Sequence, residues 1–252
     1  MIIGINGKIG SGKDTVGSII QYLTDKNVKG MSFEDWYASN VYSVYQVTGK
    51  WEIKKFAGKL KQTASLLTGI PIDLFEDQEF KKTELAEDWN YYPIIGYGHR
   101  NVPVYGEPEQ PMLVREFLQK LGTEAMRDGL HTNVWVNALF ADYKAKWVPT
   151  GDSVAEEDVS LEKEYPNWII TDMRFPNEMD AVVERKGITI RVVRSFNHKM
   201  GSKEIGTLDL TPQHPSETAI DDAEFDYEII NDGYIADLID KVIDILTLEK
   251  LI

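Results

Sequence analysis

One segment near the N-terminus constrains the fold of this chain more than any other. Residues 7–15 fit the pattern G-x-x-x-x-G-K, in the order Gly7-Lys8-Ile9-Gly10-Ser11-Gly12-Lys13-Asp14-Thr15. The apolar residues 1–6 before it predict a buried strand, and from Asp14 to about Lys26 the apolar side chains recur with helical spacing. In a strand, glycine-rich loop and helix of this kind, the loop N–H groups and the helix N-terminus bind phosphate oxygens. The segment therefore predicts a phosphate-binding loop.

The residues of this loop divide into backbone and side-chain ligands. We expect a bound ATP to be held by Gly10, Ser11, Gly12, Lys13, Asp14 and Thr15, with Lys13 reaching the β- and γ-phosphates. Asp14 stands where a Mg²⁺-binding serine or threonine is usual. An aspartate there could hold Mg²⁺ through water, cap the helix, or act near the phosphoryl acceptor.

Strand patterns separated by helix patterns follow along the rest of the chain. The expected strands are 1–6, 51–56, 167–171, 188–193 and 227–230, and the expected helices are 14–26, 58–68, 113–121, 133–147, 177–186 and 235–246, with Gly122 ending the third helix. This alternation predicts a parallel sheet with right-handed crossovers and a ligand site at the carboxyl ends of the strands. The glycine-rich loop, Asp172, Arg194 and Asn231 all fall at such ends.

The remaining segments read as additions to a single domain over 1–252 that is built around the phosphate-binding loop. Residues 28–50 are aromatic and irregular and are interpreted as an insertion, and residues 149–165 as an acidic, mobile excursion. A substrate-binding region is expected over about 57–147, with an irregular, proline-rich part at 70–111. The polar residues 195–224 are expected to form a lid.

Several charged residues are candidates for phosphate and metal binding. Asp172 and Arg174 follow a hydrophobic strand, where an acidic residue can orient Mg²⁺, although a structural Asp–Arg pair is also common there. Glu178, one helical turn beyond Arg174, could hold that arginine in place. Arg194 opens the polar lid segment, a position suited to neutralising charge on a transferring phosphoryl group.

Cations earlier in the chain are weaker candidates on spacing alone. Arg115 lies on a predicted helix, where its guanidinium could clamp a phosphate bidentately or could simply be solvated. Lys61, Lys81 and Lys82 have a similar standing.

Composition excludes several classes of protein. The chain has 252 residues, of which 42% are hydrophobic, so a sizeable core can be buried. The formal charge of −14 argues against binding of a polynucleotide, while a small anion remains compatible with a few local cations. No apolar run approaches the ~18 residues of a membrane-spanning helix. The N-terminus has no basic leader and the chain has no cysteine, so we expect a cytoplasmic enzyme without disulfides or thiolate metal sites.

These residues together resemble the phage deoxynucleoside monophosphate kinases, which are distant relatives of adenylate kinase and of the animal phosphomevalonate kinases. An aspartate after the loop lysine is usual in that family. The shared pieces are Gly12-Lys13-Asp14-Thr15, Phe56-Ala57-Gly58 leading to Lys61, Arg115 through Leu121-Gly122-Thr123, Trp135-Val136, Asp172-Met173-Arg174, Asn177-Glu178-Met179-Asp180-Ala181, Val192-Val193-Arg194, His214 to Glu217, and Ile230-Asn231-Asp232-Gly233.

The resemblance implies an α/β fold, a three-layer P-loop kinase with a five-stranded parallel sheet of order 2-3-1-4-5 and helices on both faces. The implied reaction is ATP + dNMP → ADP + dNDP with Mg²⁺, and the resemblance allows a homodimer. The implied catalytic residues are Lys13, Asp14, Arg174 and Arg194, with Asp14 and Asp172 as metal ligands and Asn231 and Asp232 beside the ATP adenine. The implied acceptor contacts are Lys61, Arg115, Gly122, Thr123, Trp135, Asp172 and Glu178.

Two other functions are compatible with the sequence. The His214–Glu217 segment also resembles phosphomevalonate kinases, so the acceptor could be another phosphorylated small molecule, such as phosphomevalonate or dephospho-coenzyme A. A nucleotide-dependent switch without kinase activity is the second alternative. A switch needs no second anion site, so the several candidate arginines count against it.

Overall fold

The structure is a computed structural model that describes residues 1–26, 28, 30–42, 51–150, 160–195 and 218–252. The chain divides into two compact units, one made of Met1–Phe56 with Ala138–Ile252 and the other of Ala57–Asn137. Each unit is described by itself.

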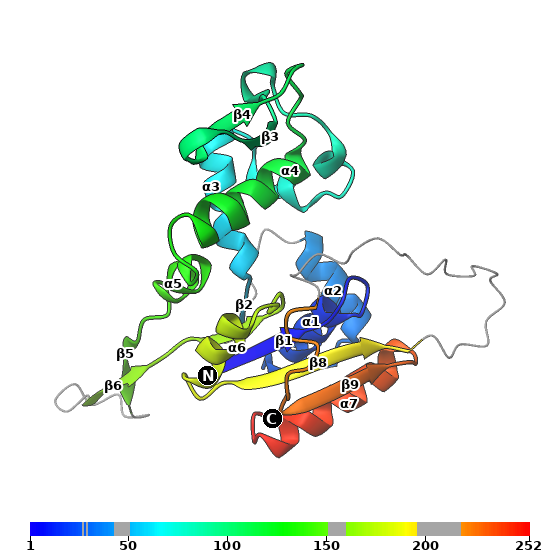
Figure 1. Cartoon of the computed structure of the whole chain (residues 1–252). Helices are drawn as coiled ribbons and strands as arrows, with labels where there is room; N and C mark the ends of the chain where they lie inside the picture. Colours follow the sequence, from blue (N-terminus) through cyan, green and yellow to red (C-terminus); the bar gives the residue numbers. More distant parts are fainter. Residues whose placement is uncertain (27, 29, 43–50, 151–159, 196–217) are drawn as a thin grey trace. The chain divides into compact units, whose positions relative to one another are not determined.

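The first unit is built on a single parallel sheet (Figure 1). Its five strands are β1 (Ile2–Asn6), β2 (Trp51–Lys54), β7 (Asn167–Ile170), β8 (Ile188–Arg194) and β9 (Tyr227–Asn231). They are arranged in the order β2-β7-β1-β8-β9, and every neighbouring pair is parallel. Numbered along the chain within this sheet alone, the order is 2-3-1-4-5. The expected parallel sheet is therefore confirmed, and its carboxyl ends share one edge.

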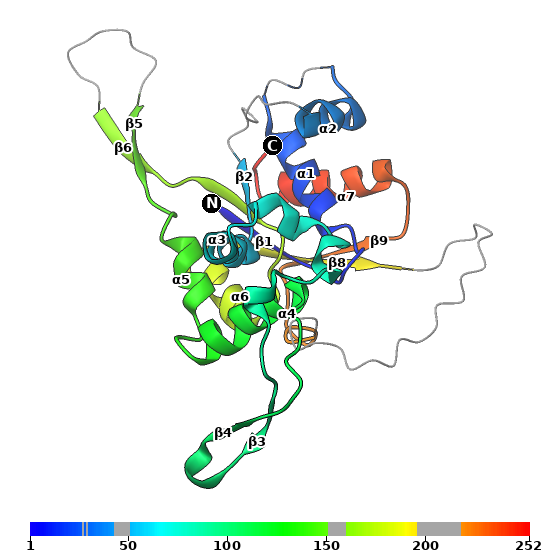
Figure 2. The same cartoon turned by 90° about the horizontal axis from the view of Figure 1, so that it is seen from above.

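Helices cover both faces of this sheet, as the two views in Figures 1 and 2 show. The helices of this unit are α1 (Lys13–Thr24), α2 (Phe33–Tyr42), α6 (Pro176–Val183) and α7 (Ile235–Leu248). Ile3 and Ile5 of β1 belong to one buried cluster with residues of α1, α2 and α7. Gly4 faces α6 instead, and a Cβ there would lie 2.9 Å from Met173 Sδ and 3.2 Å from Val182. Among the described residues, no helix is both long enough and apolar enough to cross a membrane.

The prediction that residues 28–50 are irregular is wrong for α2. Ser32 begins this helix: the Asp35 N–H donates to Ser32 Oγ at 3.1 Å, and Ser32 Oγ donates to the Asp35 carboxylate at 2.8 Å. Phe33 and Trp36 then pack against Tyr22 of α1, each with ring centroids 5.6 Å apart. Phe33 and Trp36 thus lie on the buried face of a helix. Residues 43–50 lie outside the described part of the chain.

The helix expected over 133–147 is also shorter than predicted. α5 (Val134–Phe140) ends where Phe140 stacks on Trp168, and β5 (Lys146–Thr150) pairs antiparallel with β6 (Ser160–Glu164). Lys146 lies directly opposite Glu164, an opposite-charge pair that favours a sheet. The excursion expected over 149–165 therefore ends in a strand, and its residues 151–159 lie outside the described residues.

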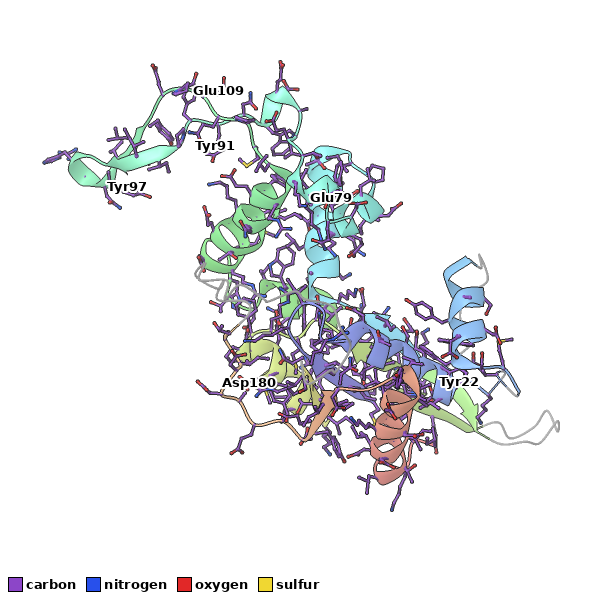
Figure 3. The ribbon with its side chains drawn as sticks, turned by 90° about the vertical axis from the view of Figure 1, so that its right-hand side faces the viewer. Tyr22, Glu79, Tyr91, Tyr97, Glu109 and Asp180 are labelled. Carbon is purple, nitrogen blue, oxygen red and sulfur yellow. The ribbon has the colours of Figure 1, made fainter. Side chains whose placement is uncertain are left out.

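The second unit combines helices, short 3₁₀ turns and one hairpin. Its elements are α3 (Phe56–Thr68), η1 (Ile72–Glu76), η2 (Phe80–Lys82), η3 (Glu87–Trp89), β3 (Ile94–Tyr97), η4 (His99–Asn101), β4 (Pro103–Tyr105), α4 (Val114–Gln119) and η5 (Lys120–Asp128). Ala64, Phe75, Val114 and Phe117 lie in its core. The hairpin side chains, Tyr97 among them, are largely exposed (Figure 3).

Gly122 does not end a helix, contrary to the prediction. The helix of α4 continues as the π-helical turns of η5 to Asp128. A Cβ on Gly122 would lie 3.0 Å from Leu60 Cδ2, closer than nearly all real Cβ contacts. Gly122 therefore allows η5 to pack closely against α3.

Most of the lid expected over 195–224 cannot be described. Residues 196–217, including His214, Ser216 and Glu217, lie outside the described residues. In the part that follows, Ile220 is buried, and the Arg191 guanidinium donates to the carbonyl oxygens of Ile220 and Ala223. This end of the segment is tied to β8.

Candidate active site

The glycine-rich loop joins β1 to α1 at the carboxyl edge of the sheet. Gly10 and Gly12 have φ values of 76° and 98°, in the left-handed region that favours glycine. A Cβ on Gly12 would also lie only 2.5 Å from Asn231 Nδ2. The loop therefore requires glycine at these two positions, and at Gly12 for two separate reasons.

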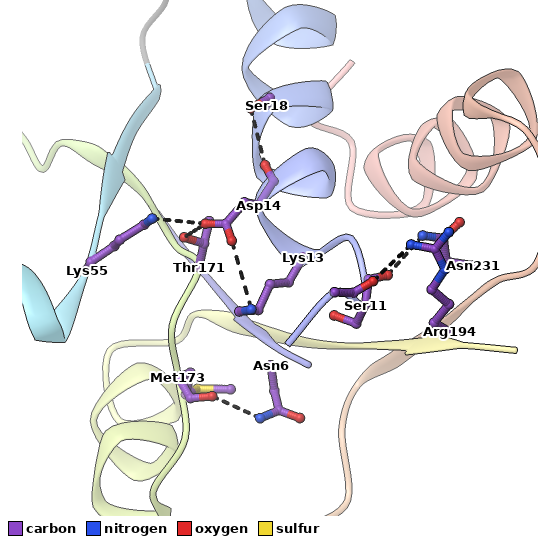
Figure 4. Close-up of polar contacts among 11 residues, drawn as sticks. Asn6, Ser11, Lys13, Asp14, Ser18, Lys55, Thr171, Met173, Arg194 and Asn231 are labelled. Carbon is purple, nitrogen blue, oxygen red and sulfur yellow. Dashed lines mark hydrogen bonds and ion pairs between the residues drawn. The ribbon is translucent and has the colours of Figure 1, made fainter. Parts of the chain in front are cut away.

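Side chains from β8 and β9 hold the backbone of this loop. The Arg194 guanidinium donates to the Gly10 carbonyl at 3.1 Å, and Asn231 Nδ2 donates to the Ser11 carbonyl at 2.9 Å (Figure 4). The C=O and N–H of one trans peptide point in opposite directions. Fixing the Ser11 carbonyl on Asn231 therefore turns the Gly12 N–H to the other side of the loop, where it can bind an anion.

Ser11 carries the one buried side-chain oxygen of the described residues that has no hydrogen-bond partner. A Cβ on Gly7 would lie 2.3 Å from this hydroxyl, so Gly7 leaves the space that the hydroxyl occupies. Buried polar atoms are nearly always paired in folded proteins. The hydroxyl is thus one group of the loop that a phosphate oxygen would satisfy.

Asp14, in the first turn of α1, is surrounded by donors from three elements (Figure 4). Lys55 Nζ lies 3.0 Å from Asp14 Oδ1, and Thr171 Oγ1 donates to the same oxygen at 2.9 Å. Lys13 Nζ lies 3.9 Å from Oδ2. The Asp14 carboxylate thus contacts residues that follow β2 and β7, and no side chain caps the N-terminus of α1 at Gly12. Of the three roles left open by the sequence, helix capping therefore has no support.

The charges in this cluster perturb one another. Partial burial on its own would raise the pKa of Asp14, but Lys55, Thr171 and Lys13 outweigh it, and the pKa lies below its usual value. The pKa of Lys13 is also lowered, first by burial and then by the nearby cations Arg174 and Lys55, with Asp14 and Asp172 opposing the shift. A nearly buried ammonium group among other cations gains most when an anion binds to it.

The end of β7 supplies the remaining charged groups near Lys13. Asp172 Oδ1 accepts the Phe56 N–H at 2.8 Å. Glu178 is almost completely buried, and its Oε2 accepts the N–H groups of Arg174 at 2.8 Å and Phe175 at 3.2 Å. Glu178 thus holds Arg174 through its backbone N–H group.

Asp232, expected beside the adenine, is held by α7. Lys241 Nζ lies 2.8 Å from Asp232 Oδ1 and donates to the Ile230 carbonyl at 2.6 Å. Sequence reasoning did not identify Lys241, because nothing in the pattern of α7 distinguishes it from other exposed lysines. It also missed Lys55, for which a signal existed: Lys55 directly follows the strand β2.

The acceptor-side candidates belong to the second unit. Lys61 is mostly buried, with Nζ 2.5 Å from Glu76 Oε1, and Arg115 Nη2 donates to Gln78 Oε1 at 3.4 Å. The indole N–H of Trp135 donates to the Gly122 carbonyl at 2.9 Å, and Thr123 follows in the same π-helical segment. Two of the expected residues, Gly122 and Trp135, are therefore in contact with each other.

Two carboxylates at this sheet edge are candidates for holding a magnesium ion. Within the described residues, no three His, Cys, Asp or Glu side chains form a group that could hold a metal ion. Mg²⁺ in nucleotide sites is usually bound by one or two carboxylates, with phosphate oxygens and water completing the shell. Asp14 and Asp172, both of which act on Lys13, are the residues that could take this part.

A parallel sheet of this order, with a glycine-rich loop between β1 and α1 and an acidic residue after β7, defines the class of P-loop kinases. Residues 86–242 match the family profile described as deoxynucleotide monophosphate kinase. A deoxynucleoside-5'-monophosphate kinase of Escherichia phage T5 is 25% identical, over 92% of this chain and 89% of that protein. The profile spans more than half of the chain, so the chain belongs to the deoxynucleotide monophosphate kinase family. The resemblance noted from the sequence is confirmed, and the protein is a nucleotide kinase.

Proposed function

We propose that this protein transfers the γ-phosphate of ATP to a deoxynucleoside 5'-monophosphate and so produces the diphosphate. The observation that carries this proposal is the Lys13–Asp14 pair at the start of α1, with Lys55 and Arg174 acting on it. A glycine-rich loop alone would bind nucleotide. Additional cations beside the loop lysine are what the transfer of a charged phosphoryl group requires.

On the donor side, the loop amides and Lys13 bind the ATP phosphates. Asp14 and Asp172 would hold Mg²⁺ or its water ligands, and the ion neutralises charge on the β- and γ-phosphates when it is bound. Asn231 and Asp232 border the adenine. Asn231 also donates to the backbone carbonyl of Ser11, another residue of this proposed ATP site.

On the acceptor side, Lys61 and Arg115 bind the phosphate of the monophosphate, with Gly122, Thr123 and Trp135 as further contacts. Asp172 and Glu178 complete this set, and Glu178 acts by fixing the backbone of Arg174. Arg174 and Arg194 stabilise the charge that develops on the transferring group. Phosphoryl transfer needs little covalent chemistry from a protein, so positioning and charge neutralisation account for the catalysis.

A coupled assay of ADP formation with the full chain tests this proposal. The acceptors are the four common deoxynucleoside monophosphates, their ribose counterparts, phosphomevalonate, dephospho-coenzyme A, and no acceptor. We expect turnover with at least one deoxynucleoside monophosphate far above the rate without acceptor. Turnover with phosphomevalonate or dephospho-coenzyme A alone would replace the proposed acceptor. ADP release that no acceptor changes would identify an ATPase switch.

Replacing Lys13 tests the donor site within the same assay. We expect Lys13→Ala to lower kcat by at least about 100-fold, because it removes a preorganised charge from the transferring group. Lys163→Ala is the matched control: this lysine lies over the Trp147 ring on the β5–β6 hairpin, and its loss should leave kcat unchanged. Activity of Lys13→Ala within tenfold of wild type, with a normal circular dichroism spectrum, would refute the proposed donor site.

A further inference from the structure

The two oxygens of the Asp14 carboxylate have different surroundings. Oδ1 receives both close donors, Lys55 Nζ at 3.0 Å and Thr171 Oγ1 at 2.9 Å. Oδ2 faces Lys13, whose Nζ is 3.9 Å away and beyond hydrogen-bond distance. In Figure 4 the dashed lines from Lys55 and Thr171 end on one oxygen of the carboxylate, and the line to Lys13 ends on the other. One oxygen is therefore fixed, and the other faces the loop lysine.

We propose that Thr171 and Lys55 are positioning residues that hold Asp14 by Oδ1 and so direct Oδ2 toward the metal ion and phosphates of the bound donor. This inference rests on the proposed function, because it assumes that the donor binds at Lys13. It assigns a role to two residues that neither the sequence patterns nor the comparisons with relatives single out.

The sheet brings these two donors together. β2 and β7 are parallel neighbours with Lys54 paired to Ile170, so Lys55 and Thr171 are the next residues beyond the two strand ends. The Thr171 N–H also donates to the Lys54 carbonyl at 3.3 Å. Both donors thus stand at fixed positions just beyond the ends of adjacent strands, whereas the Asp14 side chain is more than half exposed.

Thr171 is completely buried, and its two branches meet different parts of the protein. Its methyl group faces Gly17 of α1, where a Cβ would lie 2.7 Å from Thr171 Cγ2. Its hydroxyl donates to Asp14. A β-branched side chain has few χ1 states, so the methyl contact also fixes the direction of the hydroxyl. Because the Thr171 hydroxyl already fixes the Asp14 carboxylate, Asp14 loses little conformational freedom when the donor binds.

A pair of substitutions separates the hydroxyl from the methyl group. Thr171→Val keeps the shape and loses the donor, and Thr171→Ser keeps the donor and loses the methyl group. The readout is the ATP affinity in excess Mg²⁺ divided by the ATP affinity in EDTA, both measured by titration calorimetry without acceptor. This ratio reports how well the protein uses the metal ion, and it does not depend on turnover.

We expect Thr171→Val to lower this ratio about tenfold, as loss of a group that orients a metal ligand does, and Thr171→Ser to change it by less than about twofold. If Thr171 acts only in packing, Thr171→Ser will have the larger effect and the proposal fails. Equal ratios for both variants and wild type would also overturn it. Thermal unfolding of each variant shows whether it is folded at the assay temperature.

Lys55 is tested by the sign of the change. If Lys55 only neutralised Asp14, Lys55→Met would leave the Asp14 carboxylate uncompensated, and the ratio of the ATP affinity in Mg²⁺ to that in EDTA would rise. If Lys55 orients Asp14, the ratio falls, and Lys55→Arg restores it in part. Turnover by the wild-type protein distinguishes failure of the positioning role from failure of the proposed function. If the wild type is active and Thr171→Val has a normal Mg²⁺/EDTA affinity ratio, only the positioning role is refuted.

Discussion

Alanine substitutions at Gly10 and Gly12 test how the phosphate-binding loop is held. Both glycines have left-handed φ values, but their surroundings differ. A Cβ on Gly10 meets nothing within 4 Å, whereas a Cβ on Gly12 would lie 2.5 Å from Asn231 Nδ2. Gly10→Ala therefore introduces backbone strain alone. Gly12→Ala introduces the same strain and also displaces the amide that binds the Ser11 carbonyl.

The expected magnitudes follow from these two terms. A left-handed alanine costs about 1–2 kcal/mol, so Gly10→Ala should lower the free energy of unfolding by about that amount. Displacing Asn231 removes a hydrogen bond with a net contribution of about 0.5–1.5 kcal/mol. Gly12→Ala should therefore cost about 1.5–3.5 kcal/mol in total.

Urea denaturation of the two variants, each in wild-type and Asn231→Ala backgrounds, measures both terms. Without the Asn231 side chain, Gly12→Ala should cost no more than Gly10→Ala, which gives a coupling of about 1 kcal/mol between positions 12 and 231. Equal costs for the two glycines in the wild-type background would refute the argument, because they would mean that Asn231 does not constrain the loop.

Three further predictions concern other parts of the site. Folding lowers the pKa of Asp14 from 3.8, so the ionised carboxylate stabilises the folded state above that pH. The difference in unfolding free energy between wild type and Asp14→Asn should therefore shrink as the pH falls below 3.8. A difference that stays constant with pH in urea titrations would contradict this. Glu178→Ala should destabilise the protein by about 2–3 kcal/mol, because two partly buried N–H groups lose the buried carboxylate that accepts from them, and Glu178→Gln should cost less. Equal thermal shifts for the two variants would argue against this role. Arg115→Ala should weaken monophosphate binding by about 1.5–3 kcal/mol and ATP binding far less, with Arg115→Lys in between, and calorimetry showing equal losses for both ligands would exclude an acceptor clamp.

The sheet and the loop could be predicted from the sequence because their signals are local. Each of the strands β1, β7 and β8 is a short apolar run next to a turn or helix signal, and the glycine pattern lies between the first strand and its helix. The position of Asp172, Arg194 and Asn231 at strand ends followed from the same reading. Their common edge is a consequence of parallel pairing.

The incorrect predictions arose where one residue type can serve two purposes. The Ser32–Asp35 pair is a helix-start signal, but the surrounding aromatic residues were interpreted as irregular chain. Glycine commonly marks the end of a helix, which led to the prediction for Gly122. In the structure the absence of a Cβ at Gly122 instead allows close packing against Leu60. The helix over 133–147 was predicted because the helical spacing of apolar residues continues past Phe140. In the structure, β5 forms there instead because it pairs with β6, which the local sequence does not reveal.

The roles of Lys55 and Thr171 could not be read locally at all. Neither residue belongs to the glycine-rich pattern, and their approach to Asp14 depends on the register between β2 and β7. That register joins segments more than a hundred residues apart in the chain. A sequence pattern can place a residue at a strand end, but only the pairing of strands decides which side chains meet there.

The charge distribution of the described site explains how an acidic protein can bind two anions. The chain has a formal charge of −14, yet Lys55 and Arg174 both act on Lys13 at one sheet edge. Their mutual repulsion is offset by Asp14 and Asp172, since both carboxylates raise the pKa of Lys13 while the other cations lower it. A site with cations alone would bind phosphate strongly but would destabilise the unliganded fold. If Asp14 and Asp172 also bind Mg²⁺, as proposed above, this conflict is removed, because a metal ion bound with the donor would compensate the same two negative charges.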